Sequence, residues 1–206
     1  MKTRHIILIV IAAALAGTIF YTATDHSGED NWRKELLQER EEKDLFMRNS
    51  DESPFRQDST QSFTELSWYS PDLKYRVIAN LEPADKQLIT LNTSDGQLQQ
   101  YARYAWATFD LDDFRCKLLL LEPLGMGASR DMLFLPFADA TSAMDTYGAG
   151  RYLELKKVPG AGTITLDFNK AYNPYCAYVE SYSCPLPPSE NILKVPIQAG
   201  EKNYHP

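Results

Sequence analysis

Residues 151–168, RYLELKKVPGAGTITLDF, decide the fold class because they contain two short alternating segments around a turn rich in glycine and proline. In the second segment Ile164, Leu166 and Phe168 alternate with polar residues. This is the two-residue period of a β-strand with one buried face. Residues 162–168 are therefore expected to form a strand whose apolar side chains face the core.

The first segment predicts a charge that points inward. Leu153 and Leu155 share one face of the strand expected at residues 151–158, and Arg151 is in phase with them. The opposite face carries Tyr152, Glu154 and Lys156. A guanidinium on the core side needs a carboxylate or an anionic ligand, because an unpaired buried charge is too costly.

The rest of the chain after residue 62 has the same β character. Asp95-Gly96 is a hairpin signal, and the run CKLLLLEP reads as a buried strand. Together with the two segments above, we expect strands at residues 75–79, 87–93, 97–109, 116–123, 131–137 and 193–199. About eight short strands with few helix signals between them predict a mainly β fold, an antiparallel β-barrel or sandwich-like domain.

One α-helix is expected before the strands. Residues 32–49 are good helix formers, and Glu39 and Lys43 make a favourable pair four residues apart. Pro54 follows in a polar linker that runs to Gln61.

The N-terminus reads as a targeting segment. Lys2 and Arg4 precede an apolar run from Ile6 to Tyr21, which fits either a cleaved signal peptide or a retained signal anchor. The positive charges before the run are expected to stay on the cytoplasmic side, so the body is expected on the outer side of the membrane, exported or periplasmic. The predicted organisation is a leader or transmembrane segment at 1–24, a helix and linker at 25–62, and a β-rich domain at 63–206.

The net negative charge of the chain limits the classes of binding partner that can be expected. The net charge is −7, and removing the leader would delete Lys2 and Arg4 but no acid. Such a surface repels phosphate backbones, so nucleic acid is not an expected partner. The expected partners are a membrane, through the N-terminal segment, and an unidentified small ligand or envelope protein.

Histidine chemistry is nearly absent. The chain has His5, His26 and His205, and the first two lie in or beside the leader. A triad that depends on histidine would have to recruit His205, the penultimate residue, so we do not expect such triads or zinc sites rich in histidine. No cofactor fingerprint is present either, so we expect no cofactor and no resident metal.

Two polar segments, residues 134–155 and 166–191, and the short motif at 200–202 hold the candidate ligand-binding residues. These are Asp139, Thr141, Tyr147, Arg151, Asp167, Asn169, Tyr172, Asn173 and Glu201. One interpretation is a pocket for an anionic or polar ligand with Arg151 as a bidentate clamp. The other is a structural network of ion pairs beneath loops.

Cys176 and Cys184 close a nine-residue loop. In an oxidising compartment a disulfide is the default expectation, with about 2.5 kcal/mol of loop-closure stabilisation. Unpaired structural thiols and a metal or redox site remain alternatives, although the spacing is not that of a zinc knuckle. Cys116, beside four leucines, is expected to be a free buried thiol.

Several motifs resemble a known family. They are PFADATSAMDTYGAGRYLEL (136–155), LDFNKAYNPYCAY (166–178), CPLPPSENIL (184–193) and AGEK (199–202). Together they are similar to the bacterial and archaeal family named domain of unknown function 1684. The resemblance extends more loosely from residue 32 and departs at Ala143, where the family is expected to have glycine. It implies one domain, often exported, and assigns no catalytic residues.

The leading functional hypothesis is a small-ligand or protein-binding module with a polar pocket around Arg151. The alternative is a hydrolase, with or without a metal, in which carboxylates such as Asp139 or Glu201 act as acid or base. A second alternative is a structural envelope protein that has no ligand.

Overall fold

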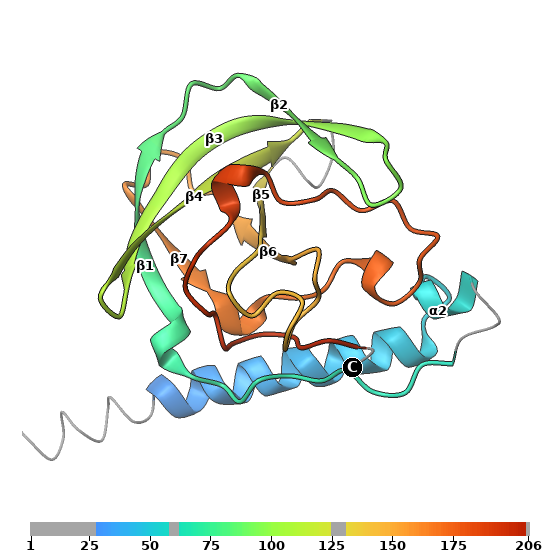
Figure 1. Ribbon diagram of the computed structural model, residues 1–206. Helices are drawn as coiled ribbons and strands as arrows, with labels where there is room; N and C mark the ends of the chain where they lie inside the picture. The colour runs from blue at the N-terminus through green and yellow to red at the C-terminus, as the bar shows by residue number, and fades with distance from the viewer. Residues whose placement is uncertain (1–27, 58–61, 125–130, 205–206) are drawn as a thin grey trace, which may run out of the picture. The chain divides into compact units, whose positions relative to one another are not determined.

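The computed structural model describes residues 28–57, 62–124 and 131–204 (Figure 1). The chain divides into two compact units, residues 1–42 and 43–206. The expected leader at 1–24 lies outside the described residues, so the signal peptide and the anchor stay predictions. Among the helices that are described, none is long and apolar enough to cross a membrane.

The expected N-terminal helix is present and runs over residues 28–49. Its last two turns, from Lys43 onward, belong to the second unit. A short helix α2 (Pro54–Gln57) follows, where a polar linker was expected. Ser53 caps this helix by accepting a hydrogen bond from the Phe55 backbone N–H, and Pro54 suits its first position.

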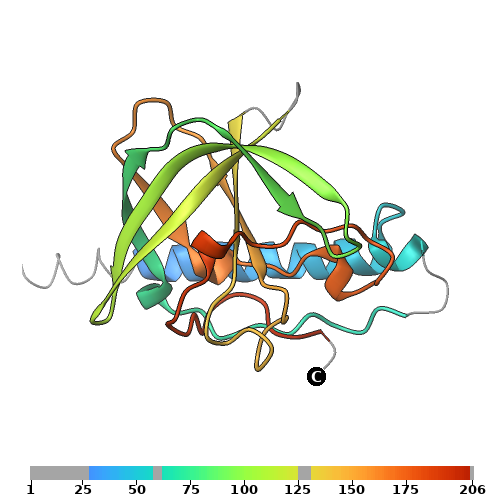
Figure 2. The same cartoon turned by 45° about the horizontal axis from the view of Figure 1, so that its top comes forward.

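The second unit is mainly antiparallel β, which confirms the expected fold class. Seven strands form one sheet in the order β6-β5-β4-β3-β1-β7, with β2 paired to β3 beside this path. Figures 1 and 2 show that the sheet curls strongly, into a half-barrel. The strands are β1 (Arg76–Pro83), β2 (Leu88–Asn92), β3 (Leu98–Leu111), β4 (Phe114–Pro123), β5 (Met132–Phe137), β6 (Arg151–Lys156) and β7 (Thr163–Asp167).

Strand β3 causes much of this curvature because it pairs with three strands. Its first residues pair with β2, its later residues pair with β1, and β4 lies along its other edge. The register with β4 shifts between Arg103 and Ala105. A bulge of this kind bends a strand and increases its twist.

Apolar side chains cover both faces of the sheet. In β4, residues Leu118 to Leu121 have no exposed surface, as expected for a strand buried on both sides. Leu118 and Leu120 belong to the large inner core, which also contains Leu153 and Leu166. On the other face, Leu119, Leu121, Phe134, Tyr152, Cys176 and Cys184 form a second cluster with tyrosines around it.

The strand expected at residues 193–199 is absent, and this expectation was wrong. Leu193, Val195, Ile197 and Ala199 are buried alternately, as a strand would bury them, but no ladder forms. Pro196 cannot donate a hydrogen bond to a neighbour. This C-terminal strap, residues 192–201, runs along the open side of the half-barrel (Figures 1 and 2). Separate backbone hydrogen bonds, such as that from the Leu193 N–H to the Ala138 carbonyl oxygen at 2.8 Å, hold its backbone together with buried side chains.

Short 3₁₀ helices hold the ends of the strap and its neighbours in place. They are η1 (Leu73–Tyr75), η3 (Phe168–Lys170), η4 (Tyr175–Ala177) and η5 (Ser189–Asn191). Asn191, at the end of η5, is fully buried against β4. Its amide donates to the carbonyl oxygens of Leu119 (2.9 Å) and Pro136 (2.8 Å), and its oxygen accepts from the Leu119 N–H at 2.6 Å. Asn191 therefore binds β4 as a neighbouring strand would.

Candidate functional site

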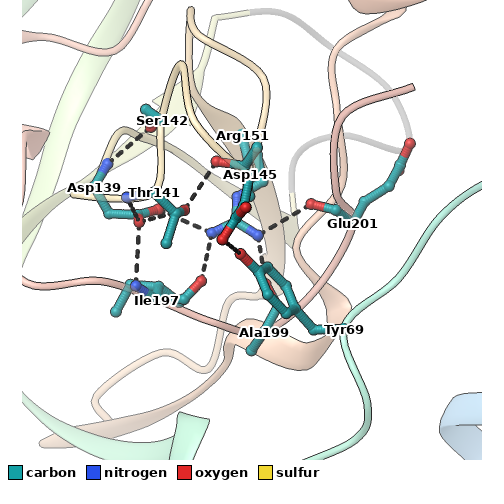
Figure 3. A network of polar contacts seen from close by, with 10 residues as sticks. Tyr69, Asp139, Thr141, Ser142, Asp145, Arg151, Ile197, Ala199 and Glu201 are labelled. Carbon is teal, nitrogen blue, oxygen red and sulfur yellow. Dashed lines mark hydrogen bonds and ion pairs between the residues drawn. The ribbon is translucent and has the colours of Figure 1, made fainter. Parts of the chain in front are cut away.

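Arg151 points into the core from the start of β6, as its phase predicted, and has no exposed surface. Its Nη2 donates to Asp139 Oδ2 and to the Ile197 carbonyl oxygen, both at 2.9 Å. Its Nη1 donates to the carbonyl oxygens of Ala199 and, at 3.2 Å, Glu201. Figure 3 shows the guanidinium held among these acceptors. Both terminal nitrogens are thus engaged by protein atoms.

Asp139 completes this network from the loop after β5. Its Oδ1 accepts from the Thr141 backbone N–H (2.8 Å), the Thr141 hydroxyl (2.7 Å) and the Ile197 N–H (3.1 Å). The Asp139 N–H in turn donates to the Ser142 hydroxyl at 3.1 Å (Figure 3). The terminal nitrogens of the guanidinium and the carboxylate therefore pair with each other and fasten the C-terminal strap.

Glu201 is the centre of a second buried network. Its Oε2 accepts from the Lys43 ammonium at 2.8 Å and from the Asn173 N–H at 3.2 Å. Its Oε1 accepts from the Asn173 amide at 3.0 Å and from the Tyr178 hydroxyl at 2.5 Å. Burial, and then the negative Glu201, raise the pKa of Tyr178 well above its usual value. Glu201 is thus paired with protein donors on both oxygens.

The candidate residues Asp167 and Asn169 lie in a third group at the end of β7. The Asp167 Oδ1 accepts from the Asn169 N–H (3.1 Å) and amide (3.0 Å), while Arg76 Nε lies 3.7 Å from Asp167 Oδ2. The Asn169 amide also donates to the Asp72 carbonyl oxygen at 2.8 Å. The nine residues predicted from the sequence therefore fall into several groups, and most of their polar atoms bind protein groups.

A groove of about 480 Å³ lies on the outer face of the sheet. We call it the aromatic groove; it is lined by Tyr101, Pro123, Met132, Leu133, Phe134, Tyr152, Glu154, Tyr172 and Pro185. Tyr152 and Glu154 point to it together because they are two residues apart on β6, on the face opposite Arg151. Among the residues predicted from the sequence, only Tyr172 lines it.

The rings of the aromatic groove pack in series. Tyr101 stacks on Phe134 with centroids 5.4 Å apart, and the edge contacts from Phe134 to Tyr152 (4.8 Å) and from Tyr152 to Tyr172 (5.9 Å) continue the series. The Tyr152 hydroxyl donates to the Pro185 carbonyl oxygen at 2.6 Å, which holds the far wall. The groove is therefore bounded by strands on one side and by the loop before η5 on the other.

One carboxylate lies in this aromatic setting. The Tyr172 hydroxyl donates to Glu154 Oε1 at 2.9 Å, while Oε2 has no hydrogen-bond or ion-pair partner in the described part of the chain. Burial, and then the charge of Glu154, raise the pKa of Tyr172, so its hydroxyl stays protonated and donates. The groove thus presents an exposed negative charge beside π-faces.

The two cysteines of the expected disulfide are free thiols within one cluster. The Cys176 backbone N–H donates to the Cys184 sulfur at 3.1 Å, and the candidate Tyr147 donates its hydroxyl to the Cys176 sulfur at 3.7 Å. Cys116 is also free and lies apart from them, in the inner core. Within the described ranges, no group of three or more potential metal ligands is present.

Sequence reasoning missed Tyr101, Phe134, Tyr152 and Glu154 as site residues. The alternation within residues 151–158 placed Tyr152 and Glu154 on one face of the strand. This was the one feature of the sequence that could have pointed to them. What could not be read from the sequence was that Tyr101 from β3 and Phe134 from β5 lie beside them, because that neighbourhood depends on the strand order β6-β5-β4-β3.

Comparison with known proteins finds a family and a solved structure. The model of the family described as "Protein of unknown function (DUF1684)" matches residues 61–202. A solution NMR structure of an uncharacterised protein from Haloarcula marismortui is similar, with 36% sequence identity and a TM-score of 0.66. That alignment covers 85% of this chain and 96% of the other. No functionally curated protein matches the chain significantly.

Proposed function

Because the chain belongs to DUF1684, a family of unknown function, we propose its function from geometry: a small-ligand-binding module whose aromatic groove takes an organic cation. The ligand class is a small molecule with an ammonium group on an apolar body. The observation that carries this proposal is the free oxygen of Glu154 beside the rings of Tyr152 and Tyr172.

Charge favours a cation over an anion or a neutral molecule. Among the described residues that line the groove there is one carboxylate and no basic side chain. The nearby Lys43 ammonium lies 4.5 Å from the centroid of the Tyr172 ring, but Glu201 compensates it at 2.8 Å. The local sum is therefore one negative charge, and Lys43 illustrates that the face of Tyr172 attracts ammonium groups.

Size and chemistry fit a small ligand. A volume of about 480 Å³ lies within the range of ordinary ligand sites, which are mostly apolar with few polar groups. Each cation–π contact contributes about 0.5–2 kcal/mol, and the Glu154 carboxylate adds an ion pair. We expect a dissociation constant on the order of 1 mM or tighter for a minimal ammonium ligand, which corresponds to about 4 kcal/mol.

This proposal moves the binding site away from Arg151, where the sequence placed it. The terminal nitrogens of Arg151 bind Asp139 and three carbonyl oxygens, which leaves them no capacity for a ligand. The carboxylates named for a hydrolase, Asp139 and Glu201, are likewise bonded through both oxygens to protein donors. No observation in the described residues favours the hydrolase.

We further propose that the leader, residues 1–24, carries the β unit to the outer side of a membrane, as a signal peptide or as an anchor. The support is the basic start at Lys2 and Arg4 before an apolar run. A phosphatase reporter fused after residue 206 would be active under this proposal and inactive if the body stays inside the cell.

Titration with choline, followed by tyrosine and tryptophan fluorescence or NMR, tests the binding proposal. The variant Glu154→Gln should bind about tenfold more weakly, because it loses the charge and keeps the shape. Glu65→Gln removes a charge of the same kind from an exposed position outside the groove lining and should bind as the wild type does. Equal binding by all three proteins, or no binding by any, would refute the proposal.

A further inference from the structure

Cys176 and Cys184 meet between η4 and the hairpin of β2 and β3. The Cys176 N–H donates to the Cys184 sulfur at 3.1 Å, and both side chains belong to one buried cluster. Ser94, in the hairpin turn, fixes Cys184 through two hydrogen bonds: the Cys184 N–H donates to Ser94 Oγ at 3.1 Å, and the Ser94 N–H donates to the Cys184 carbonyl oxygen at 2.9 Å. The sulfurs are therefore held together by contacts on both sides.

We propose that Cys176 and Cys184 form a peroxide-reactive dithiol, in which the Cys176 sulfur attacks a small hydroperoxide and Cys184 resolves the product to a disulfide. This site is separate from ligand binding and does not depend on the proposed cation.

The hydrogen bonds distinguish the two sulfurs. The Cys176 sulfur accepts a hydrogen bond from the Tyr147 hydroxyl at 3.7 Å. A hydrogen bond from the neighbouring Cys184 thiol is the main cause that lowers the pKa of Cys176 to about 6, against the opposing effect of burial. The same hydrogen bond raises the pKa of Cys184. Cys176 is thus the thiolate and the nucleophile, and Cys184 keeps its proton.

The chemistry balances in two steps. The Cys176 thiolate attacks one peroxide oxygen, the O–O bond breaks, and the leaving alkoxide or hydroxide takes a proton, so that Cys176 becomes a sulfenic acid. The Cys184 sulfur then attacks the Cys176 sulfur, and the S–O bond breaks with release of water. The two sulfurs supply the two electrons that reduce the hydroperoxide.

The burial of Cys176 and Cys184 restricts the oxidants that can reach them to small molecules. Cys176 is 7% exposed and Cys184 is 6% exposed, so a large protein disulfide cannot approach either sulfur in the folded state. Hydrogen peroxide is close to water in size and needs only a narrow opening. Cys116 provides the contrast within the same chain: burial, and then the charge of Asp110, raise its pKa, and no second cysteine lies in its cluster.

Mass spectrometry of the full chain tests the proposal. The chain is reduced, freed of reductant, exposed to hydrogen peroxide and then blocked with N-ethylmaleimide. We expect a mass loss of about 2 Da with a single maleimide, on Cys116. In Cys184→Ser, dimedone should label Cys176, whereas in Cys176→Ser it should label neither remaining cysteine on that time scale. Cys116→Ser should form the disulfide as the wild type does.

Other outcomes would overturn the proposal. One is that the wild type, after peroxide, still takes up three maleimides. A second is a disulfide that includes Cys116. A third is that dimedone labels Cys184 in the variant Cys176→Ser. If a serine variant fails to fold, the reduced wild-type protein can be used instead. It is treated with less than one equivalent of N-ethylmaleimide, and peptide mapping shows which cysteine is labelled first. Cys176 should be labelled about tenfold faster than Cys184 or Cys116, and equal labelling would contradict the assignment.

Discussion

Arg151 Nη2 and Asp139 Oδ2 lie 2.9 Å apart, and neither side chain has exposed surface. Both side chains also bind the backbone of the C-terminal strap, at the carbonyl oxygens of Ile197, Ala199 and Glu201 and at the Ile197 N–H. The ion pair therefore adds side-chain hydrogen bonds to the separate backbone bonds that hold the strap, such as that from the Leu193 N–H to the Ala138 carbonyl oxygen. Residues 193–199 are thus buried like a strand although no continuous ladder forms.

Replacing Arg151 with methionine should lower the free energy of unfolding by about 3–5 kcal/mol, because Asp139 would stay buried without its partner. Urea denaturation measures the change. Arg76→Met is the matched control, since its partner Asp167 is 3.7 Å away and the Arg76 side chain is 48% exposed. We expect less than about 1 kcal/mol for the control. Equal losses in both variants would contradict a fastening role for Arg151.

Gly200→Ala should destabilise the protein by at least about 1 kcal/mol more than Gly160→Ala. Both glycines have positive φ, +80° and +75°, so alanine strains the backbone at either position. At Gly200 an added Cβ would also lie 2.6 Å from the Ala171 carbonyl oxygen and 2.7 Å from that of Phe168, whereas at Gly160 nothing lies within 4 Å. Thermal or urea unfolding of the two variants compares them, and similar losses would mean that the strap relaxes.

Asn191→Asp should lower the free energy of unfolding by about 2–4 kcal/mol, because a carboxylate cannot donate to the buried carbonyl oxygens of Leu119 and Pro136. Asn203→Asp is the control, since its amide makes one long, exposed hydrogen bond of 3.4 Å. Urea denaturation at neutral pH measures both variants. A loss at Asn191 as small as that at Asn203 would show that β4 does not depend on this side chain.

The fold class could be predicted from the sequence because apolar and polar residues alternate along several of the strands. In residues 162–168, alternation and flanking glycines agree, and β7 forms there. Residues 193–199 alternate equally well, so alternation could not reveal that the Arg151–Asp139 pair and a few separate backbone hydrogen bonds hold this segment in place of a continuous ladder. Alternation reports which side chains are buried, whereas a ladder requires a partner strand.

The candidate site was predicted less well for a physical reason. Arg151 was correctly expected to point inward and to need a partner, but burial made it a structural residue with both terminal nitrogens engaged. The groove residues Tyr101, Phe134 and Glu154 are ordinary strand residues in the sequence. They become a site only when the strand order β6-β5-β4-β3 places them close together on one face of the sheet.

Tyr147→Phe should raise the pKa of Cys176, because a hydrogen bond from the Tyr147 hydroxyl is one of the causes that lower it. In the wild type, alkylation of Cys176 by iodoacetamide should reach half of its maximum near pH 6 and rise above it, since the thiolate is the reactive form. The variant should shift this midpoint to higher pH.

Tyr182→Phe controls for the loss of a hydroxyl beside the same cluster, because the Tyr182 hydroxyl has no partner among the described residues. It should leave the midpoint for Cys176 unchanged. Equal shifts in the two variants would show that Tyr147 acts through packing and not through its hydrogen bond.

Recognition of positive charge is the property that we propose for the aromatic groove. Calorimetric or NMR titration of the wild type with choline, and with the neutral analogue in which carbon replaces the quaternary nitrogen, measures this directly because the two probes have the same shape. We predict that choline binds at least about tenfold more tightly and perturbs Tyr152 and Tyr172. Equal or tighter binding of the neutral analogue would contradict recognition of charge by the groove.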